Sequence, residues 1–194
     1  MATGNSYKSL HCGFRVVHIT ISKIIHQTCG AIFEEYGSEV TVTPTNPEEM
    51  MEVAEKCSKR WDFHNVVGAL DGKYVAIRCP PKSGSFYFNY KGFYSIILLA
   101  LVDAGYNCLY VDIGANGTSS DGGVFDDTSL YDALEEGTAG LPETLPIPND
   151  DQHLPFCIVG DDAFGLRTWL LKPYPHRCMT NQEKIFNYRL SRAR

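Results

Sequence analysis

Three aspartates of this chain are placed where the ends of neighbouring strands could bring their carboxylates together. Asp71 follows the apolar run Val66–Leu70, Asp121 lies in a Gly/Ser-rich segment, and Asp161 follows a second apolar run. Hard cations such as Mg²⁺ prefer oxygen ligands, and two such ions can activate a water molecule and stabilise the leaving oxygen of a phosphodiester. The pattern therefore predicts a divalent-cation site for phosphoryl transfer.

Each aspartate taken alone has a simpler explanation. Asp71 and Gly72 form a common turn pair, and Asp121 and Asp161 could each cap a following helix. The occurrence of all three together weakens this explanation without removing it.

The composition is that of an ordinary globular chain. The 194 residues are 44% hydrophobic and 21% charged, which suits one domain of moderate size with a smaller appendage. The 7 cysteines are scattered and form no CxxC pair, so we expect reduced thiols in an intracellular protein instead of disulfides or a zinc cluster. No apolar stretch is as long as a membrane span, and the N-terminus lacks the pattern of a secretory signal, so no membrane contact is expected.

The charges are segregated along the chain, whose net charge is -6. Residues 112–162 include many Asp and Glu and no Lys or Arg, whereas residues 172–194 carry mainly basic charges and a single acid, Glu183. This pattern fits an acidic, metal-attracting centre flanked by edges that contact phosphates. A solvated acidic loop beside a basic terminus explains it equally well.

Residues 1–60 are predicted to form a small helical segment. Apolar spacing over 7–36 predicts a short helix, a turn and a longer helix that begins near Thr20 and breaks after Gly30. This arrangement is similar to a helix-turn-helix, although any helical hairpin gives the same pattern. A third helix begins at the Asn46–Pro47 pair, and we place a domain boundary after it, near residue 60.

Residues 61–194 predict an α/β domain. Strands are expected over 66–78 (with a break at Asp71–Gly72), 93–103, 108–114 and 156–159, and helices over 124–134, 163–171 and 181–194. Three strands in a meander, a helix, another strand and then helices are typical of a ribonuclease H-like core, which is a mixed sheet with flanking helices.

Five segments are more specific than any single aspartate. They are Gly68–Val75 (GALDGKYV), Asn89–Ile96 (NYKGFYSI), Asn116–Phe125 (NGTSSDGGVF), Gly160–Phe164 with Leu170–Tyr174 (GDDAF and LLKPY), and Phe186–Arg194 (FNYRLSRAR). Together they resemble the motifs of the PIF/Harbinger transposase family, which includes the Harbinger transposase-derived nucleases. The resemblance covers nearly the whole chain from about Gly4 onward.

The resemblance implies a ribonuclease H-like nuclease domain of the DDE type, which hydrolyses DNA phosphodiester bonds with Mg²⁺ or Mn²⁺. Asp71 matches the first catalytic carboxylate, and Asp121 and Asp161 match acidic positions associated with metal binding. We favour Asp161 as the second catalytic residue because it follows the fourth predicted strand, with Asp121 as an accessory metal ligand, but the choice between them stays open. Asp162 stands where the family often has a small residue, and it could replace or perturb its neighbour.

The resemblance also implies a catalytic glutamate a few residues beyond Arg194. Glu183 is the only acid after Asp162, and it lies at the wrong point of the motif. We therefore expect the sequence to be a fragment, a truncated gene model or a decayed element. The chain is then either a metal-dependent DNA endonuclease or a catalytically inactive remnant that binds DNA or protein.

Partners and location follow from the resemblance as expectations. DNA is the implied substrate, a Myb-like DNA-binding protein is an implied partner, and the nucleus is the implied location, with the cytoplasm as an alternative. Four basic residues are candidates for contacts with DNA phosphates, although solvated surface charge explains each of them equally well: Lys73, Lys91, Arg189 and Arg192.

Overall fold

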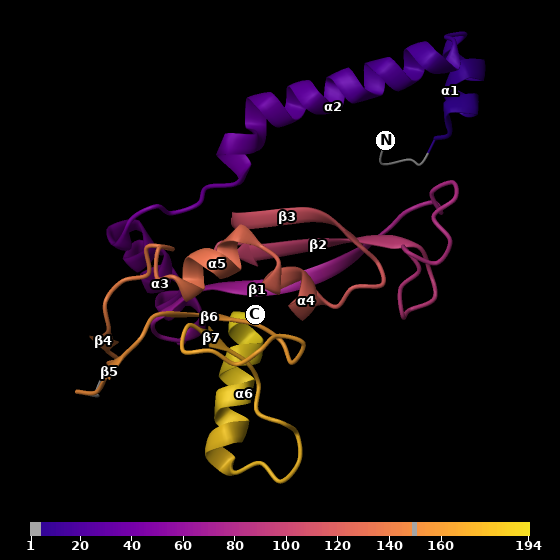
Figure 1. The fold of residues 1–194 in the computed structure, drawn as a ribbon. Coiled ribbons are helices and arrows are strands. Elements are labelled where there is room, and N and C mark those ends of the chain that lie inside the picture. The colour runs from indigo at the N-terminus through magenta and orange to yellow at the C-terminus, as the bar shows by residue number, and fades with distance from the viewer. Residues whose placement is uncertain (1–4, 149–150) are drawn as a thin grey trace. The chain divides into compact units, whose positions relative to one another are not determined.

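The computed structural model of the protein describes residues 5–148 and 151–194. The chain divides into two compact units, unit 1 (Met1–Val40) and unit 2 (Thr41–Arg194). Figure 1 shows the elements of both units in chain order.

The division between the units precedes the boundary that the sequence predicts near residue 60. Helix α3 (Pro47–Trp61) belongs to unit 2, although the sequence analysis assigned it to the N-terminal segment. Its side chains Met50 and Val53 are buried in the same core as Leu70 of the sheet. The apolar face of α3 therefore packs against the core of unit 2.

Unit 1 consists of helix α1 (Tyr7–Phe14) and helix α2 (His18–Val40). Arg15, in the left-handed conformation, ends α1. Helix α2 continues through Gly30, where the sequence predicts a break, because a glycine inside a helix costs only about 1 kcal/mol relative to alanine. The helices meet at 107° across a short turn, a geometry that helix-turn-helix motifs share. That this unit reads DNA stays a prediction.

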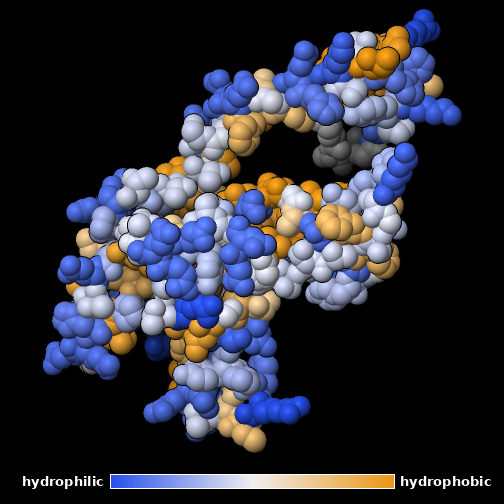
Figure 2. All heavy atoms as spheres, viewed as in Figure 1, coloured by the Kyte–Doolittle hydropathy of each residue, from blue (hydrophilic) through white to orange (hydrophobic). Residues whose placement is uncertain are grey.

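Unit 1 buries little apolar surface. Ile21 is the buried residue of α2, and Figure 2 shows hydrophobic side chains exposed near the junction of the two helices, where Phe14, Val17 and Ile19 are exposed. No single helix in the described part of the chain is long and apolar enough to cross a membrane, and α1 and α2 have the length and composition for it only when they are counted together across their bend.

Unit 2 is built on a five-stranded mixed sheet in the order β3-β2-β1-β6-β7 (Figure 1). The first three strands form an antiparallel meander, whereas β6 pairs parallel to β1 and β7 parallel to β6. This sheet with its flanking helices is the ribonuclease H-like arrangement that the sequence predicts, so the α/β fold class is confirmed. The strands are β1 (Val66–Ala76), β2 (Ser95–Val102), β3 (Cys108–Asn116), β6 (Cys157–Val159) and β7 (Leu170–Leu171).

The alternation of side chains along β1 defines the two faces of the sheet. Odd-numbered residues from Ala69 to Lys73 line the face on which helix α6 (Asn181–Ala193) lies. Leu70 and Tyr74 point to the other face, where they pack with the helices α4 (Asp121–Asp126) and α5 (Ser129–Glu135). An aspartate at or beside β1 therefore lies either on the face of α6 or on the face of α4 and α5.

Two predicted features of the strands and helices are wrong. Strand β1 has no break at Asp71 and Gly72, because Ala100 and Leu99 of β2 pair opposite them. The helix predicted over 163–171 is a series of turns followed by strand β7. A short apolar run does not distinguish a buried strand from a helix, and here the decision comes from the pairing of β7 with β6.

The segment between β3 and β6 also differs from its predicted form. The helix expected over 124–134 is divided into α4 and α5, because the Thr128 hydroxyl accepts a hydrogen bond from the Tyr131 N–H and starts a new helix. The acidic segment that follows includes the short paired strands β4 (Leu145–Pro146) and β5 (His153–Leu154). Residues 149–150 of this segment lie outside the described residues.

Candidate functional site

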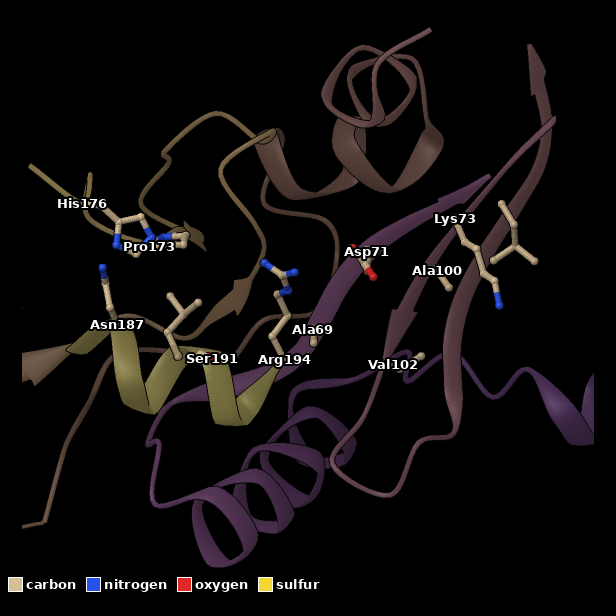
Figure 3. A pocket seen from close by; sticks show the side chains of 12 residues that line it. Ala69, Asp71, Lys73, Ala100, Val102, Pro173, His176, Asn187, Ser191 and Arg194 are labelled. Carbon is tan, nitrogen blue, oxygen red and sulfur yellow. The ribbon is translucent and has the colours of Figure 1, made fainter. Parts of the chain in front are cut away.

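Asp71 lies in the middle of strand β1, not at its end as the sequence predicts. Its side chain is exposed and lines a cavity of about 630 Å³ between the sheet and the C-terminal half of α6 (Figure 3). Apolar residues of β1 and β2 form the floor of this cavity. The polar residues that share it with Asp71 are Lys73, His176, Asn187, Ser191 and Arg194.

Asn187 of helix α6 binds the loop that follows β7, and this loop forms one wall of the cavity. Its side-chain amide nitrogen donates to the Tyr174 carbonyl oxygen at 2.9 Å, and its amide oxygen accepts from the Tyr174 N–H at 2.8 Å. This paired contact holds the loop after β7 on helix α6, and the same loop carries His176 to the cavity. Asn187 lies within one of the motif segments of the sequence, but its type and spacing indicated no role for it, and His176 lies outside all five segments.

Asp161 follows β6 at the point where that strand leaves the sheet. Val159 pairs in parallel with Ala69. Asp161 and Asp71 are each two residues further along their strands, so parallel register carries both toward the same region. One carboxylate oxygen of Asp161 accepts the Ala163 N–H at 2.9 Å, which closes a tight turn.

Lys172 clamps the turn that carries Asp161. Its ammonium group donates to the carbonyl oxygens of Asp162 at 3.2 Å and Phe164 at 3.1 Å. It also lies 3.3 Å from a carboxylate oxygen of Asp162. Asp162, which could replace or perturb Asp161 according to the sequence, therefore forms the ion pair that holds its neighbour's turn.

Asp121 is the first residue of helix α4 and packs on the face of β1 opposite to Asp71. A Cβ atom built on Gly72 would lie 2.3 Å from Asp121 Cγ, so a larger residue would displace this carboxyl group from its present position. A Cβ on Gly122 would lie 2.4 Å from the carbonyl oxygen of Ala163. Two glycines thus let the start of α4 approach both β1 and the turn after Asp161.

The carboxyl group of Asp121 is partly removed from water without compensation. Its Oδ1 atom is buried and, among the described residues, has no hydrogen-bond partner. Burial raises the pKa of Asp121 above the ordinary range, and the negative charges of Asp161 and Asp71 raise it further, whereas Lys91 lowers it. Mutual repulsion among three carboxylates with one unpartnered oxygen is the electrostatic condition that a bound cation relieves.

The three aspartates are neighbours without forming a finished metal cage. In the described ranges 5–148 and 151–194, no three His, Cys, Asp or Glu side chains are grouped closely enough to hold one metal ion. The reason is that side chains alternate along β1, so positions 71 and 72 face opposite sides of the sheet. Asp121 packs against Gly72 and therefore lies on the side opposite to the Asp71 side chain. The oxygen donors nevertheless fit a hard divalent cation, because Asp121 Oδ1 has no partner in the part of the chain that the structure describes and the Asp71 side chain is exposed.

The candidate phosphate contacts do not lie on one surface. Lys73 lines the cavity with Asp71, and Lys91 lies 5.3 Å from the ring centre of Tyr74 on the face where Asp121 packs. Arg189 faces away from the cavity and pairs with Asp62 at 3.5 Å. Arg192 lies 5.9 Å from the ring centre of Tyr188 on α6. Arg194 lines the cavity, and the sequence analysis did not select it.

Glu183 has a local structural role at the start of α6. Its carboxylate accepts the Thr180 N–H at 2.6 Å, and the Thr180 hydroxyl accepts the Glu183 N–H at 3.3 Å, which together form a capping box. The Thr180 N–H and the Thr180 hydroxyl, which also donates to the carboxylate at 2.8 Å, lower the pKa of Glu183. The Glu183 carboxylate therefore caps the start of α6 and does not line the cavity.

Comparisons with known proteins identify the class of this fold and site. A family model described as DDE superfamily endonuclease matches residues 70–194. The chain therefore belongs to the DDE superfamily endonucleases, and the resemblance that the five motif segments indicate is confirmed.

Individual relatives are similar at low identity. "Protein ALP1-like" of Arabidopsis thaliana is 30% identical over 149 residues, which are 76% of this chain and 36% of that protein. "Putative nuclease HARBI1" of Mus musculus is 30% identical over 128 residues, which are 66% of this chain and 31% of that protein. The chain thus spans about a third of the length of these relatives. No solved structure matches it.

Proposed function

We propose that this chain is the core of a metal-dependent DNA endonuclease, in which Asp71 and Asp161 are the catalytic carboxylates and Asp121 is a further metal ligand. The observation that carries the proposal is the Oδ1 atom of Asp121, which is buried and has no hydrogen-bond partner among the described residues, in a carboxyl group whose pKa the charges of Asp161 and Asp71 help to raise. Membership of the DDE superfamily endonucleases, which generally use divalent metals, supports the same reading.

A bound Mg²⁺ or Mn²⁺ supplies Lewis-acid stabilisation of a phosphodiester and lowers the pKa of a bound water. The residues of the chain prepare the site for this chemistry. Asp71, Asp121 and Asp161 offer the oxygen donors, and Lys172 orients the turn of Asp161. Lys73 and Arg194 place positive charge in the cavity beside Asp71, where a DNA phosphate would neutralise it.

The alternative function is a DNA-binding module without catalysis. The observation that favours it is the lack of any ready three-ligand group in the described part of the chain. A metal site that needs a ligand from elsewhere would leave the chain able to bind DNA without cleaving it. A nuclear location, with the cytoplasm as an alternative, is part of the proposal because the proposed substrate is DNA. A Myb-like partner stays a prediction, because the names of the relatives say nothing of one.

The deciding experiment compares the wild-type chain with Asp71→Asn in two assays. Nicking of supercoiled plasmid is measured with Mg²⁺, with Mn²⁺ and with EDTA, and DNA binding is measured by fluorescence anisotropy in EDTA. For a nuclease we expect metal-dependent nicking that falls at least a hundredfold in Asp71→Asn, with DNA affinity unchanged. Asp126→Asn, an exposed carboxylate of α4, is the control that should keep full nicking.

Metal binding gives a readout that does not need catalysis. Titration with Mn²⁺, followed by electron paramagnetic resonance and by thermal melting, should show binding that weakens in both Asp71→Asn and Asp161→Asn. Nicking that is unchanged in Asp71→Asn would show that the site is assigned wrongly. DNA binding without nicking or metal binding would establish the non-catalytic alternative.

A further inference from the structure

The connection between β1 and β2 exposes aromatic side chains to solvent. In segment 77–94, which we call the aromatic loop, the exposed fractions are 56% for Phe86, 44% for Phe88 and 79% for Tyr90. Figure 1 shows this connection extending beyond the ends of the two strands that it joins. Large exposed apolar groups that are gathered in one loop indicate a binding surface, because single exposed hydrophobic residues are ordinary but clusters are not.

The charge of this region has a single sign. Between Asp71 and Asp103 the sequence contains no Asp or Glu, and the charged residues within the aromatic loop are all basic: Arg78, Lys82 and Lys91. In a chain whose net charge is -6, a stretch of this kind fits a negatively charged partner. Lys91 lies within 5.5 Å of the ring centre of Tyr90, so cation and aromatic ring share one surface.

The aromatic loop is held in shape by a buried side chain. Asn89 is 2% exposed, and its amide nitrogen donates to the Ser95 hydroxyl oxygen at 2.9 Å. Its amide oxygen accepts the N–H groups of Lys91 at 3.0 Å and Phe93 at 3.2 Å. A buried amide with all these partners fixes the turn that presents Tyr90, so the ring stands out from a preformed turn.

The aromatic loop also contacts the segment that carries Asp121. The Thr118 hydroxyl donates to the Phe86 carbonyl oxygen at 3.2 Å. A Cβ atom on Gly117 would lie 2.5 Å from the carbonyl oxygen of Tyr87, so the two backbones touch. The Tyr74 hydroxyl donates to the Ser119 carbonyl oxygen at 3.2 Å, and its ring centre lies 5.5 Å from that of Tyr90. The aromatic loop therefore adjoins the segment that carries Asp121, on the face of β1 where Asp121 packs.

We propose that the aromatic loop is a stacking platform for unpaired DNA bases, with Tyr90 as its principal ring. The inference rests on the proposed function, because it places one unpaired strand beside the candidate metal site. Aromatic faces stack on any base once the base is out of the duplex, and such contacts commonly contribute about 1–3 kcal/mol per base. In an intact duplex the base faces are covered by their neighbours, so exposed rings select unpaired nucleotides. An apolar protein partner would leave the uniform basic charge unexplained.

The test measures binding without cleavage. A fluorescein-labelled 20-nucleotide single strand and the duplex of the same sequence are titrated with the chain in EDTA, and anisotropy gives the two affinities. We expect Tyr90→Ala to weaken single-strand binding about tenfold and duplex binding much less, and Tyr90→Phe to keep most of the affinity. Lys91→Gln should weaken binding of both DNAs, since its charge meets phosphates.

Tyr106→Ala is the matched control. Tyr106 is 65% exposed in the turn between β2 and β3, outside the aromatic loop, and its ring centre lies 4.7 Å from the Arg60 guanidinium, so it is also an exposed ring beside a cation. Equal effects of Tyr90→Ala and Tyr106→Ala, or no preference of the wild type for single strands, would overturn the platform. Circular dichroism melting confirms that each variant is folded, and removal of the exposed Tyr90 ring should leave the melting temperature nearly unchanged.

The outcomes separate this inference from the proposed function. Selective loss of single-strand affinity in Tyr90→Ala, in a chain that never nicks DNA, would keep the platform and reject the nuclease. Nicking that depends on Asp71, with no effect of Tyr90→Ala on either DNA, would do the opposite. Binding of neither DNA would reject the platform and leave the loop as a candidate surface for a protein partner.

Discussion

Gly72 lies directly against the carboxyl group of Asp121. A Cβ atom at position 72 would come within 2.3 Å of Asp121 Cγ and 2.5 Å of its Oδ1 atom. The Asp-Gly pair of strand β1 thus contributes to the acidic site from both of its residues. Asp71 presents a carboxylate to one face of the strand, and Gly72 makes room for a second carboxylate on the other face.

Gly72→Ala should therefore weaken metal binding without replacing a carboxylate. The new methyl group displaces the Asp121 side chain, so we expect Mn²⁺ affinity to fall by about tenfold to a hundredfold, as for other residues that position a ligand. Isothermal titration with Mn²⁺ measures this change.

Gly68→Ala is the control for this prediction, since it lies on the same strand. Its Cβ would meet the Val102 carbonyl oxygen at 2.8 Å, far from Asp121 in the fold. We expect a loss of about 1–3 kcal/mol in the free energy of unfolding with little change in Mn²⁺ affinity of the folded fraction. Equal losses of metal affinity in both variants would contradict the role of Gly72.

Asp121 should make the stability of the metal-free protein depend on pH. Because its pKa is raised in the folded state, the folded chain binds a proton more tightly than the unfolded chain. Stability therefore falls as the pH rises from the ordinary carboxyl range through the raised pKa, and it stays lower above that window. The neutral variant Asp121→Asn escapes this loss.

Melting curves in EDTA check this prediction. We expect Asp121→Asn to melt a few degrees above the wild type at pH 7, where about 1 kcal/mol corresponds to about 2–4 °C, and to differ little near pH 4. Added Mg²⁺ should reverse the order by stabilising the wild type more. Asp126→Asn, in the same helix and exposed, should show neither effect.

The sequence was sufficient for the order of the three N-terminal helices and of strands β1, β2, β3 and β6, but not for the paired strands β4 and β5 or for strand β7. The catalytic roles of the three aspartates stay predictions. Apolar runs and the Asn46 cap are local signals, and α3 indeed begins at Pro47 after that cap. The position of Asp71 within its strand was not predictable from local signals, because an Asp-Gly pair is typical of turns. Its partner Ala100 lies far along the chain, and only this pairing keeps β1 straight.

The relative placement of the carboxylates also depends on contacts between distant segments. Strand β7 exists because Leu170 pairs with Ile158, and the predicted helix would have moved Lys172 away from the turn of Asp161. The separation of Asp71 and Asp121 by the strand follows from the packing of α4 on Gly72, which no spacing in the sequence reveals. Part of the aromatic loop lies in the motif segment Asn89–Ile96. The sequence did not predict that its rings are exposed, because exposure depends on the folded loop.

Lys172 should act on the metal site through the turn that it holds. Lys172→Met removes the donor to the carbonyl oxygens of Asp162 and Phe164, which frees the Asp161 turn. We expect about a tenfold loss of Mn²⁺ affinity, and a smaller loss in Asp162→Asn, which keeps both carbonyl contacts. Lys59→Met, which removes only an exposed pair with Glu55, should leave metal affinity and melting temperature unchanged.

Glu183 and Thr180 should affect the stability of α6 and not the chemistry of the site. Thr180→Ala removes the hydroxyl that caps the helix, so we expect the free energy of unfolding to fall by about 0.5–2 kcal/mol.

Glu183→Gln should lower the melting temperature at pH 7. The pKa of Glu183 is lowered in the folded state, so its stabilisation is present above the ordinary carboxyl range and is lost as the pH falls through the folded-state value. Denaturant melts from pH 3 to pH 7, with Mn²⁺ titrations of the same variants, check both statements. A large loss of Mn²⁺ affinity in Glu183→Gln at full stability would instead make this carboxylate a metal ligand.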